Sequence, residues 1–474
     1  MELIGRGKER RILSRCEGSD KPEFVAVYGR RRVGKTFLIV EHFSNKFAFS
    51  VTGVSDGNTR KQLGEFHAAL KKYYSGNIPM PKDWSEAFGL LEERIEADAS
   101  LGKKILFIDE LPWIDTPKSG FLSALEHFWN AFASRRPDIL LIVCGSAASW
   151  IIKNLIENYG GLHNRVTETI IVEPYSLTDC EAFYRSRSVA FNRQQIAEAY
   201  MILGGIPFYM DAMDKMLGMN QNIDLLLFEK NAKLGNEFSR LYRSLFRNAG
   251  NHMRVVEALA KHNVGMTRQE LSEASGISDG GGLTKIITEL KACALIDRDF
   301  DIARKRNGEY YKLIDFYSLF YIKYLKTRKS TDPHFWTNYL SDPGHRAWCG
   351  YAFERLCAAH VGSIKNKLGI SGVVTEVCSF RSKARKGGAQ IDLVIDRKDG
   401  VINLCECKFT NKPYALTDKD ALDLDRKKEV FLNETGTKKA IHMTMITANG
   451  LVQNAYRNEI QAEITLDDLF RPAD

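Results

Sequence analysis

The feature that most constrains the fold of this chain is the segment GRRRVGKT at residues 29–36. It fits the pattern G-x-x-x-x-G-K-[ST], follows an apolar run at 24–28 and leads into a helical pattern at 36–43. Between a strand and a helix, such a segment forms a loop whose backbone N–H groups and helix N-terminus surround phosphate groups. Both flanking elements are present, so we interpret the segment as a phosphate-binding loop rather than a chance match in an arginine-rich turn.

The loop predicts the residues of a nucleotide site. Lys35 is expected to neutralise the charge of the β- and γ-phosphates, and the Thr36 hydroxyl is expected to ligate Mg²⁺. The residues assigned to nucleotide binding are Gly29, Arg30, Arg31, Arg32, Val33, Gly34, Lys35, Thr36 and Phe37.

Two adjacent acids, Asp109 and Glu110, follow a strand-like run at 105–108. A magnesium-nucleotide site needs a carboxylate at the end of a neighbouring strand, and Asp109 supplies one that would hold the metal through water. Glu110 is expected to orient and activate the water that attacks the γ-phosphate. Taken alone, the pair is compatible with a solvated turn; downstream of a phosphate loop we interpret it as the hydrolytic pair.

Two further residues are candidates for contact with the γ-phosphate. Ser146 follows a strand-like run at 139–143 and would lie at the sheet edge where ligands bind in open α/β sheets. A helix N-cap is an equally good interpretation of this serine, and the two roles are compatible. Arg165 is the best arginine for a contact made in cis or from a neighbouring subunit, with an ordinary surface charge as the alternative.

Alternating strand and helix patterns predict the architecture. Short apolar runs at 24–28, 47–51, 105–108, 139–143 and 169–172 alternate with helical stretches, which predicts a parallel sheet covered on both faces. We expect an α/β core at 1–175 and a helical lid at 176–245, interrupted by the Gly-Gly-Ile-Pro segment that ends at Pro207.

The next segment, 246–340, predicts a winged helix-turn-helix. Helical patterns at 253–262, 267–274 and 283–292 precede strands at 296–302 and 310–314, with an Asn-Gly dipeptide suited to a hairpin turn. Residues 241–330 carry sixteen Lys and Arg against ten Asp and Glu, a surplus that favours DNA as a partner. Lys285 and the run Arg304, Lys305, Arg306 lie where such domains contact DNA; a solvated basic face or a packing module remains the alternative.

The C-terminal segment, 345–474, is predicted to be a smaller α/β domain with a second cluster of charged residues. Glu354 lies on a helix, Asp392 lies in one strand-like run, and Glu406 and Lys408 share one face of the next. The carboxylates, with Asp392 and Glu406 as ligands, suit one or two Mg²⁺ or Mn²⁺ ions, and Lys408 suits a role beside the attacked phosphate. A Glu-Lys pair on an exposed strand is the alternative. Basic residues precede the cluster: Arg381, Lys383, Arg385 and Lys386.

These motifs resemble a known combination of domains. The first 240 residues resemble the archaeal-type P-loop ATPase family of the AAA+/STAND group. The matching features are the segment that begins at Ile4, the phosphate loop, the Asp-Glu and Gly-Ser strand ends, Arg165 and the segment that ends at Pro207. The resemblance implies ATP rather than GTP, and a lid in which Pro207 faces the nucleotide. The C-terminal cluster resembles the PD-(D/E)xK restriction-endonuclease-like fold, although isoleucine stands before Asp392 where the motif has proline.

Composition limits the class of protein to which this chain can belong. The 474 residues are 44% hydrophobic and 27% charged, as in an ordinary globular protein of several domains, and nine scattered cysteines predict reduced thiols. No run reaches the roughly 20 apolar residues of a membrane helix, and the charged start is unlike a signal peptide, so we expect a cytoplasmic protein without a membrane partner.

The sequence therefore predicts an ATP-hydrolysing P-loop ATPase that acts on or near nucleic acid and carries a metal-dependent, nuclease-like C-terminal domain. The fold expected is an α/β P-loop core with a helical lid, a winged helix-turn-helix and a smaller α/β domain. The alternative is a STAND-type switch, in which ATP controls assembly or partner binding and the C-terminal domain binds without cleaving. The sequence leaves a homo-oligomer open.

Overall fold

The computed structural model describes residues 3–157, 161–162, 164–246, 248–304, 308–328, 330–382 and 388–472. The chain divides into two compact units. The first unit comprises Met1–Pro174 with two short later segments, Arg243–Arg247 and Thr288–Ala294. The second unit comprises Tyr175–Tyr242, Asn248–Ile287 and Leu295–Asp474.

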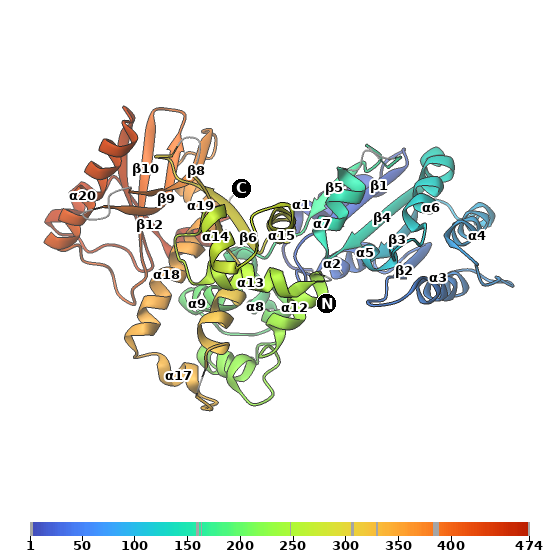
Figure 1. The fold of residues 1–474 in the computed structure, drawn as a ribbon, viewed down its shortest axis with the longest axis horizontal. Helices are drawn as coiled ribbons and strands as arrows, with labels where there is room; N and C mark the ends of the chain where they lie inside the picture. The colour runs from blue at the N-terminus through green and yellow to red at the C-terminus, as the bar shows by residue number, and fades with distance from the viewer. Residues whose placement is uncertain are drawn as a thin grey trace. The chain divides into compact units, whose positions relative to one another are not determined.

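The first unit is built on a five-stranded sheet in which every pair of neighbours is parallel (Figure 1). The strand order is β2-β3-β4-β1-β5. The strands are β1 (Glu23–Tyr28), β2 (Phe49–Thr52), β3 (Lys104–Asp109), β4 (Ile139–Gly145) and β5 (Glu168–Ile171). Each strand overlaps one of the five apolar runs, so the expected parallel α/β sheet is confirmed.

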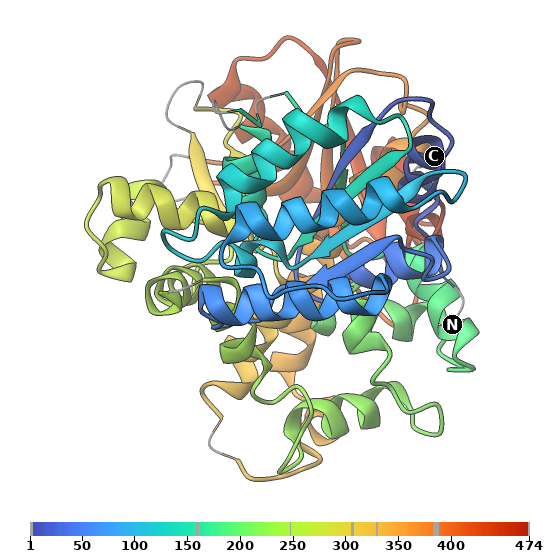
Figure 2. The same cartoon turned by 90° about the vertical axis from the view of Figure 1, so that its right-hand side faces the viewer.

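Helices follow the strands, as parallel pairs require crossover connections. Helices α3, α4 and α6 lie side by side on one side of the sheet (Figure 2). Two of these helices begin at side-chain caps, because Asn58 accepts from the backbone of Lys61 and Asp83 from that of Glu86. The helices of this unit are α1 (Gly7–Glu17), α2 (Lys35–His42), α3 (Thr59–Tyr73), α4 (Trp84–Ala97), α5 (Leu111–Ile114), α6 (Phe121–His127) and α7 (Ala148–Ile151).

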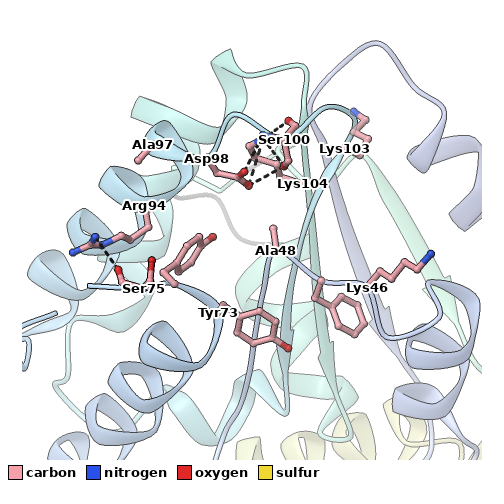
Figure 3. Close-up of a pocket in the computed structure, with 12 residues that line it drawn as sticks. Lys46, Ala48, Tyr73, Ser75, Arg94, Ala97, Asp98, Ser100, Lys103 and Lys104 are labelled. Atoms are coloured by element: carbon pink, nitrogen blue, oxygen red, sulfur yellow. Dashed lines mark hydrogen bonds and ion pairs between the residues drawn. The ribbon is translucent and has the colours of Figure 1, made fainter. Parts of the chain in front are cut away.

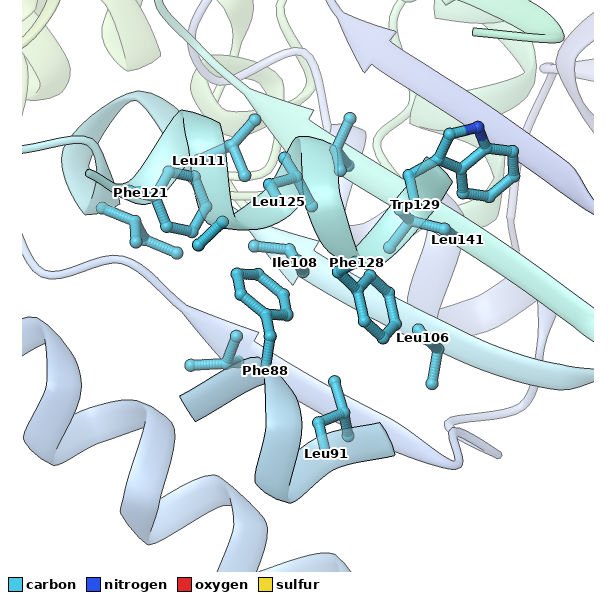
Figure 4. Packing of buried hydrophobic residues seen from close by; sticks show 14 of the residues in the cluster. Phe88, Leu91, Leu106, Ile108, Leu111, Phe121, Leu125, Phe128, Trp129 and Leu141 are labelled. Carbon is cyan, nitrogen blue, oxygen red and sulfur yellow. The ribbon is translucent and has the colours of Figure 1, made fainter. Parts of the chain in front are cut away.

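One face of this sheet packs an aromatic core against the helices (Figure 4). Phe88 of α4 stacks on Phe128 with ring centroids 5.1 Å apart, and Leu106 and Ile108 of β3 face them. Removal of a buried ring such as Phe88 costs about 3–5 kcal/mol in comparable cores. Alternate residues of the same strands, such as Val27 and Phe107, are also buried, so both faces of the sheet are covered.

The second unit begins with a helical region. Its first two helices start at capping boxes, Ser176 with Asp179 and Asn192 with Gln195, in which each residue's side chain satisfies the other's backbone N–H. The helices in this part are α8 (Leu177–Ser186), α9 (Arg193–Leu203), α10 (Pro207–Met210), α11 (Met219–Ile223), α12 (Glu237–Leu245), α13 (Ala249–Ala260), α14 (Arg268–Ser275), α15 (Gly281–Ala292), α16 (Phe316–Phe320) and α17 (Phe335–Tyr339). Helices α12 and α15 each contribute residues to both units.

The C-terminal part of the second unit is a mixed five-stranded sheet in the order β12-β11-β10-β9-β8. Strands β8, β9 and β10 are antiparallel neighbours, and β10, β11 and β12 are parallel neighbours. The strands are β8 (Thr375–Arg381), β9 (Gln390–Arg397), β10 (Val401–Lys408), β11 (Ala440–Thr447) and β12 (Ala462–Thr465). The accompanying helices are α18 (Pro343–Ala359), α19 (Val361–Lys367), α20 (Asp418–Thr435) and α21 (Leu466–Leu469).

An antiparallel hairpin of β6 (Ile296–Phe300) and β7 (Glu309–Leu313) lies against the edge strand β8. The hydroxyls of Tyr310 and Ser379 form a hydrogen bond, and the Ser379 hydroxyl donates to Asp299 over 3.1 Å. The backbone N–H of Ile302 donates to the Ser379 carbonyl over 3.0 Å. The hairpin therefore serves as a packing surface for the C-terminal sheet. Among the helices that the structure describes, none combines the length and apolar character needed to cross a bilayer.

Candidate functional site

The phosphate loop follows the carboxyl end of β1 and has a backbone that requires glycine. Gly29 has φ +146°, and a Cβ at this position would lie 2.2 Å from the carbonyl oxygen of Val172. Gly34 has φ +89° immediately before α2, and Arg32 has φ +71°. These left-handed residues turn the chain from strand to helix within a few residues, which is the conformation that a loop surrounding a phosphate needs.

Lys35 is buried at the start of α2, with its ammonium folded over the loop. Its Nζ donates to the carbonyl oxygens of Gly29 and Arg30, at 3.1 and 2.9 Å. Burial lowers the pKa of Lys35, and the nearby carboxylates of Glu110 and Asp109 oppose that effect. The ammonium is therefore held beside the loop by two neutral oxygens that a phosphate can replace.

Thr36 and Asp109 meet across the loop and the end of β3. The Thr36 hydroxyl donates to Oδ2 of Asp109 over 2.8 Å, and Oδ1 of Asp109 accepts from the backbone N–H of Glu110 over 2.9 Å. Burial raises the pKa of Asp109, and the Thr36 hydrogen bond opposes that effect. A hydroxyl and a carboxylate placed side by side are the oxygen ligands that Mg²⁺ takes beside a nucleotide.

Glu110 is held by Ser146. Its Oε1 accepts from the Ser146 hydroxyl over 2.8 Å, and its Oε2 accepts from the Ser146 backbone N–H over 3.3 Å. Glu110 also has φ +48°, a strained conformation for a non-glycine residue that is typical of functional sites. Because β4 lies between β1 and β3, its end at Gly145 brings Ser146 to the loop and to the acids at once.

The structure thus brings together Lys35, Thr36, Asp109, Glu110 and Ser146. Arg30 and Val33 are buried, while Arg31, Gly34 and Phe37 are half-buried. Ser146 was predicted to contact phosphate or cap a helix, and its contact in the structure is with Glu110.

Two further residues predicted for the site are Arg165 and Pro207. Arg165 is exposed and, within the described ranges, has no recorded side-chain contact with Lys35, Asp109 or Glu110. Pro207 is the first residue of α10 in the second unit, where its missing N–H costs the helix nothing.

Arg6 is a residue that sequence reasoning did not assign to the site. Its buried guanidinium donates to the carbonyl oxygen of Val33 over 2.9 Å and thereby stabilises the loop. The only available signal was the position of Arg6 in the N-terminal segment that carries the resemblance, because it precedes the loop by more than twenty residues.

The C-terminal cluster also converges. Glu354 of α18, Asp392 of β9 and Glu406 of β10 line one pocket of about 310 Å³. Burial, the Asp392 carboxylate and their shared hydrogen bond raise the pKa of Glu354 to about 8. The side-chain amide of Gln390 donates to Asp392 over 2.7 Å. The three carboxyl groups therefore line the same pocket.

Two lysines hold Glu406. Lys408 Nζ lies 2.9 Å from Oε1, and Lys427 Nζ of α20 lies 2.7 Å from Oε2. Burial alone would lower the pKa of Lys408, but the carboxylates of Glu406, Asp420 and Asp423 together outweigh it and the pKa is raised. Lys427 was not assigned from sequence, because a helical lysine 21 residues after Glu406 carries no motif that points to this pocket.

The remaining predictions concern a metal site and the basic residues expected to contact DNA. Across the described ranges, no group of three or more His, Cys, Asp and Glu side chains is arranged to hold a metal ion. Lys305, Arg306, Lys383, Arg385 and Lys386 lie outside the described residues. Arg304 pairs with Asp301 at 3.2 Å.

Comparisons with known proteins find distant relatives. No protein-family model matches the chain. An uncharacterised protein of Methanocaldococcus jannaschii is 23% identical over 330 residues, which cover 68% of this chain and 69% of that protein.

Solved structures similar to this chain are archaeal ATPases and origin-recognition proteins. A Walker-type ATPase of Pyrococcus abyssi matches 68% of this chain and 96% of its own with 18% identity and a TM-score of 0.48. The ORC2 protein of Aeropyrum pernix, solved with ADPNP and ADP, matches 68% of this chain and 93% of its own with 13% identity and a TM-score of 0.40. Structural similarity to such proteins thus extends over about two thirds of the chain.

Proposed function

We propose that this chain is a P-loop ATPase of the AAA+ type that binds and hydrolyses ATP. The carrying observation is the continuous set of contacts from Thr36 to Asp109 and from Glu110 to Ser146, beside the buried ammonium of Lys35. We propose the domain limits 1–175, 176–245, 246–340 and 345–474 for the core, lid, winged helix and C-terminal domain.

The loop, Lys35, Thr36 and Asp109 have proposed roles in binding the nucleotide. The loop N–H groups and Lys35 would bind the phosphates, with the Lys35 ammonium moving from the Gly29 and Arg30 carbonyls to the β- and γ-phosphate oxygens. Thr36 and Asp109 would hold Mg²⁺, which when bound offsets the negative charge on those oxygens. These residues bind and orient the nucleotide before any bond is broken.

Glu110 is the group proposed to handle the proton. Its carboxylate would orient the attacking water and accept its proton as the water oxygen bonds to the γ-phosphorus and the bond to the ADP oxygen breaks. Ser146 would hold the Glu110 carboxylate in its orientation, because it donates to both carboxylate oxygens.

Nucleotide titration tests the binding half of the proposal. Wild type and Lys35→Ala are titrated with a fluorescent ATP analogue in Mg²⁺, and Lys8→Ala, at an exposed position, is the matched control. Lys35→Ala is expected to lose binding while the control retains it. Equal affinity in all three proteins would contradict the assignment of the loop.

We propose a second function, metal-dependent cleavage of a phosphodiester, for the C-terminal pocket. It is supported by the convergence of Glu354, Asp392 and Glu406 beside Lys408. Asp392 and Glu406 would hold Mg²⁺ or Mn²⁺, which when bound supplies charge stabilisation at the attacked phosphate. Lys408 would orient the water or that phosphate, once freed from Glu406.

Incubation of the protein with plasmid DNA and Mg²⁺ or Mn²⁺, with and without ATP, tests this second function. Metal-dependent nicking or linearisation is expected. The absence of cleavage under every condition would favour the switch, in which ATP controls assembly and the C-terminal domain only binds.

Nucleic acid is proposed as the partner because residues 241–330 carry a surplus of six basic residues. Affinity for DNA is then expected to fall steeply as salt rises, since bound phosphates release counterions. Neutralising Arg304, Lys305 and Arg306 together should flatten this dependence, whereas an unchanged slope would leave the hairpin with its packing role alone.

A further inference from the structure

A second pocket lies in the first unit at the edge of the sheet opposite the phosphate loop (Figure 3). Its lining includes Ala48, directly before β2, and Lys104, the first residue of β3. The phosphate loop and Glu110 follow the carboxyl ends of their strands, whereas this pocket lies at the amino ends. Because the sheet is parallel, the two places are separated by the length of the strands. The pocket has a volume of about 560 Å³, within the range of small-molecule sites.

The chemistry of the lining is cationic and aromatic. Among the described residues of the lining, Asp98 is the one acid, set against four basic side chains: Lys46, Arg94, Lys103 and Lys104. Phe47, Tyr73 and Tyr74 supply the rings. A pocket with this balance attracts an anion that also carries an apolar or planar part.

Three of the four cations have structural partners, and Arg94 donates through its two terminal nitrogens to the carbonyl oxygens of Ser75 and Asn77, each over 3.4 Å. Lys104 is buried, donates to the Ser100 carbonyl over 3.0 Å and lies 3.6 Å from Asp98. Lys103 donates to the carbonyl oxygen of Pro137 over 2.7 Å. These lysines raise the positive potential of the pocket while their own hydrogen bonds hold the loop before β3.

Other polar groups in the lining are left for a ligand. Among the residues that the structure describes, the buried Tyr74 hydroxyl and the buried Nε of Arg94 have no hydrogen-bond partner. Burial, with Asp98 nearby, raises the pKa of Tyr74 to about 12, so its hydroxyl is a hydrogen-bond donor at neutral pH. A buried donor without a partner costs about 1–3 kcal/mol, which a bound polar group would recover. Lys46, which also lines the pocket, is exposed.

We propose that this pocket binds a mononucleotide through its phosphate and its planar base, independently of the phosphate loop. Tyr74, Arg94 and Lys46 would contact the phosphate, and the aromatic side chains would pack against the base. The inference does not depend on the proposed ATPase activity, because it rests on residues at the other edge of the sheet.

Calorimetry with AMP in a Lys35→Ala background tests the proposal, since this background removes the loop lysine. AMP is expected to bind with one-site stoichiometry, and inorganic phosphate or adenosine alone is expected to bind at least tenfold more weakly. Tyr74→Phe and Arg94→Gln should each weaken AMP about tenfold, the equivalent of one lost hydrogen bond to a charged group. Lys71→Gln, at an exposed position of α3 outside the lining, should have no effect.

A second measurement locates the site and does not depend on the folding of the variants. Photo-crosslinking of wild type with azido-AMP, in the presence of saturating ATP and Mg²⁺, should label peptides that contain residues 46–48, 73–75 or 94–104. Absence of AMP binding, affinity unchanged in both variants, or labelling confined to the loop peptide at 29–36 would each overturn the proposal. Binding of phosphate as strong as that of AMP would also overturn it, because the site would then not recognise the base.

Discussion

At the scale of single residues, the contact between Ser146 and Glu110 joins two strand ends in the proposed active site. Both hydrogen bonds from Ser146 reach the carboxylate that is proposed to accept the proton. We expect Ser146→Ala to slow ATP turnover about 10- to 100-fold, because a hydrogen bond to a charged group contributes about 1.5–3 kcal/mol. Nucleotide affinity should change little.

Steady-state ATP turnover and nucleotide affinity, measured together, check this expectation. Ser149→Ala, in the following helix, is the control, because its hydroxyl makes no recorded contact with Glu110 among the described residues. Full turnover in Ser146→Ala would show that Glu110 does not need this serine.

Arg6 provides a second expectation at this scale. Its guanidinium donates to the loop at Val33 from a buried position. Arg6→Ala is expected to lower the free energy of unfolding by about 1–3 kcal/mol, because the Val33 carbonyl loses its charged donor. Thermal unfolding checks the change in stability, and a variant as stable as wild type would contradict this role.

The sequence predicted much of this residue-level arrangement because its motifs are local. Thr36 and Asp109 were named together from one loop and one strand end, and the structure places their side chains 2.8 Å apart. Arg6 and Lys427 could not be assigned in the same way. Their contacts depend on how distant elements pack, and a lone basic residue has no sequence signature for a carbonyl or carboxylate partner.

At the scale of secondary-structure elements, His360 connects α18 to the start of α8. Its Nε2 accepts from the backbone N–H of Leu177 over 3.0 Å, and its Nδ1 donates to the Leu356 carbonyl over 2.9 Å. The contact with Leu177 requires the neutral imidazole, because Nε2 accepts in it, and burial lowers the pKa of His360. Protonation would leave two N–H groups facing each other at the helix start.

This arrangement predicts a pH-dependent stability. The unfolded chain binds the proton below pH about 6.5, whereas the folded chain resists it, so stability falls as pH drops through that value by up to about 1.4 kcal/mol per unit. His360→Phe cannot titrate, so its deficit in melting temperature relative to wild type should shrink from pH 7.5 to 5. His262→Gln, at an exposed position, should keep the wild-type profile. A constant deficit for His360→Phe would contradict the account.

The hairpin of β6 and β7 shows what the sequence could predict about elements and what it could not. Two strand-like runs with an Asn-Gly dipeptide between them indicated a hairpin, and the structure pairs β6 with β7. Its contact with β8 through Tyr310 and Ser379 was not predictable, because the partners lie 69 residues apart and no pattern records which edge a hairpin will meet. Strands β1, β3 and β4 were predictable because each is a largely buried, mostly apolar run, whereas the edge strands β2 and β5 are only partly buried.

At the scale of the whole molecule, the two candidate sites lie in different units of the chain. Asp392→Asn and Lys408→Ala are therefore expected to abolish metal-dependent cleavage of DNA while ATP hydrolysis stays at the wild-type rate. Cleavage and ATPase assays on the same preparations check this. Cleavage that survives in both variants would remove the nuclease assignment, and melting temperatures would identify a variant that has simply lost its fold.

The measurement that tests the central claim most directly compares ATP binding with ATP turnover in wild type and Glu110→Gln. The amide keeps the size of the side chain and can still meet Ser146, but it cannot accept a proton from water. We predict that Glu110→Gln binds ATP and Mg²⁺ with an affinity close to that of wild type and hydrolyses it at least 100-fold more slowly, a change of about 2.7 kcal/mol in activation free energy. Wild-type turnover in Glu110→Gln would contradict the proposed active site.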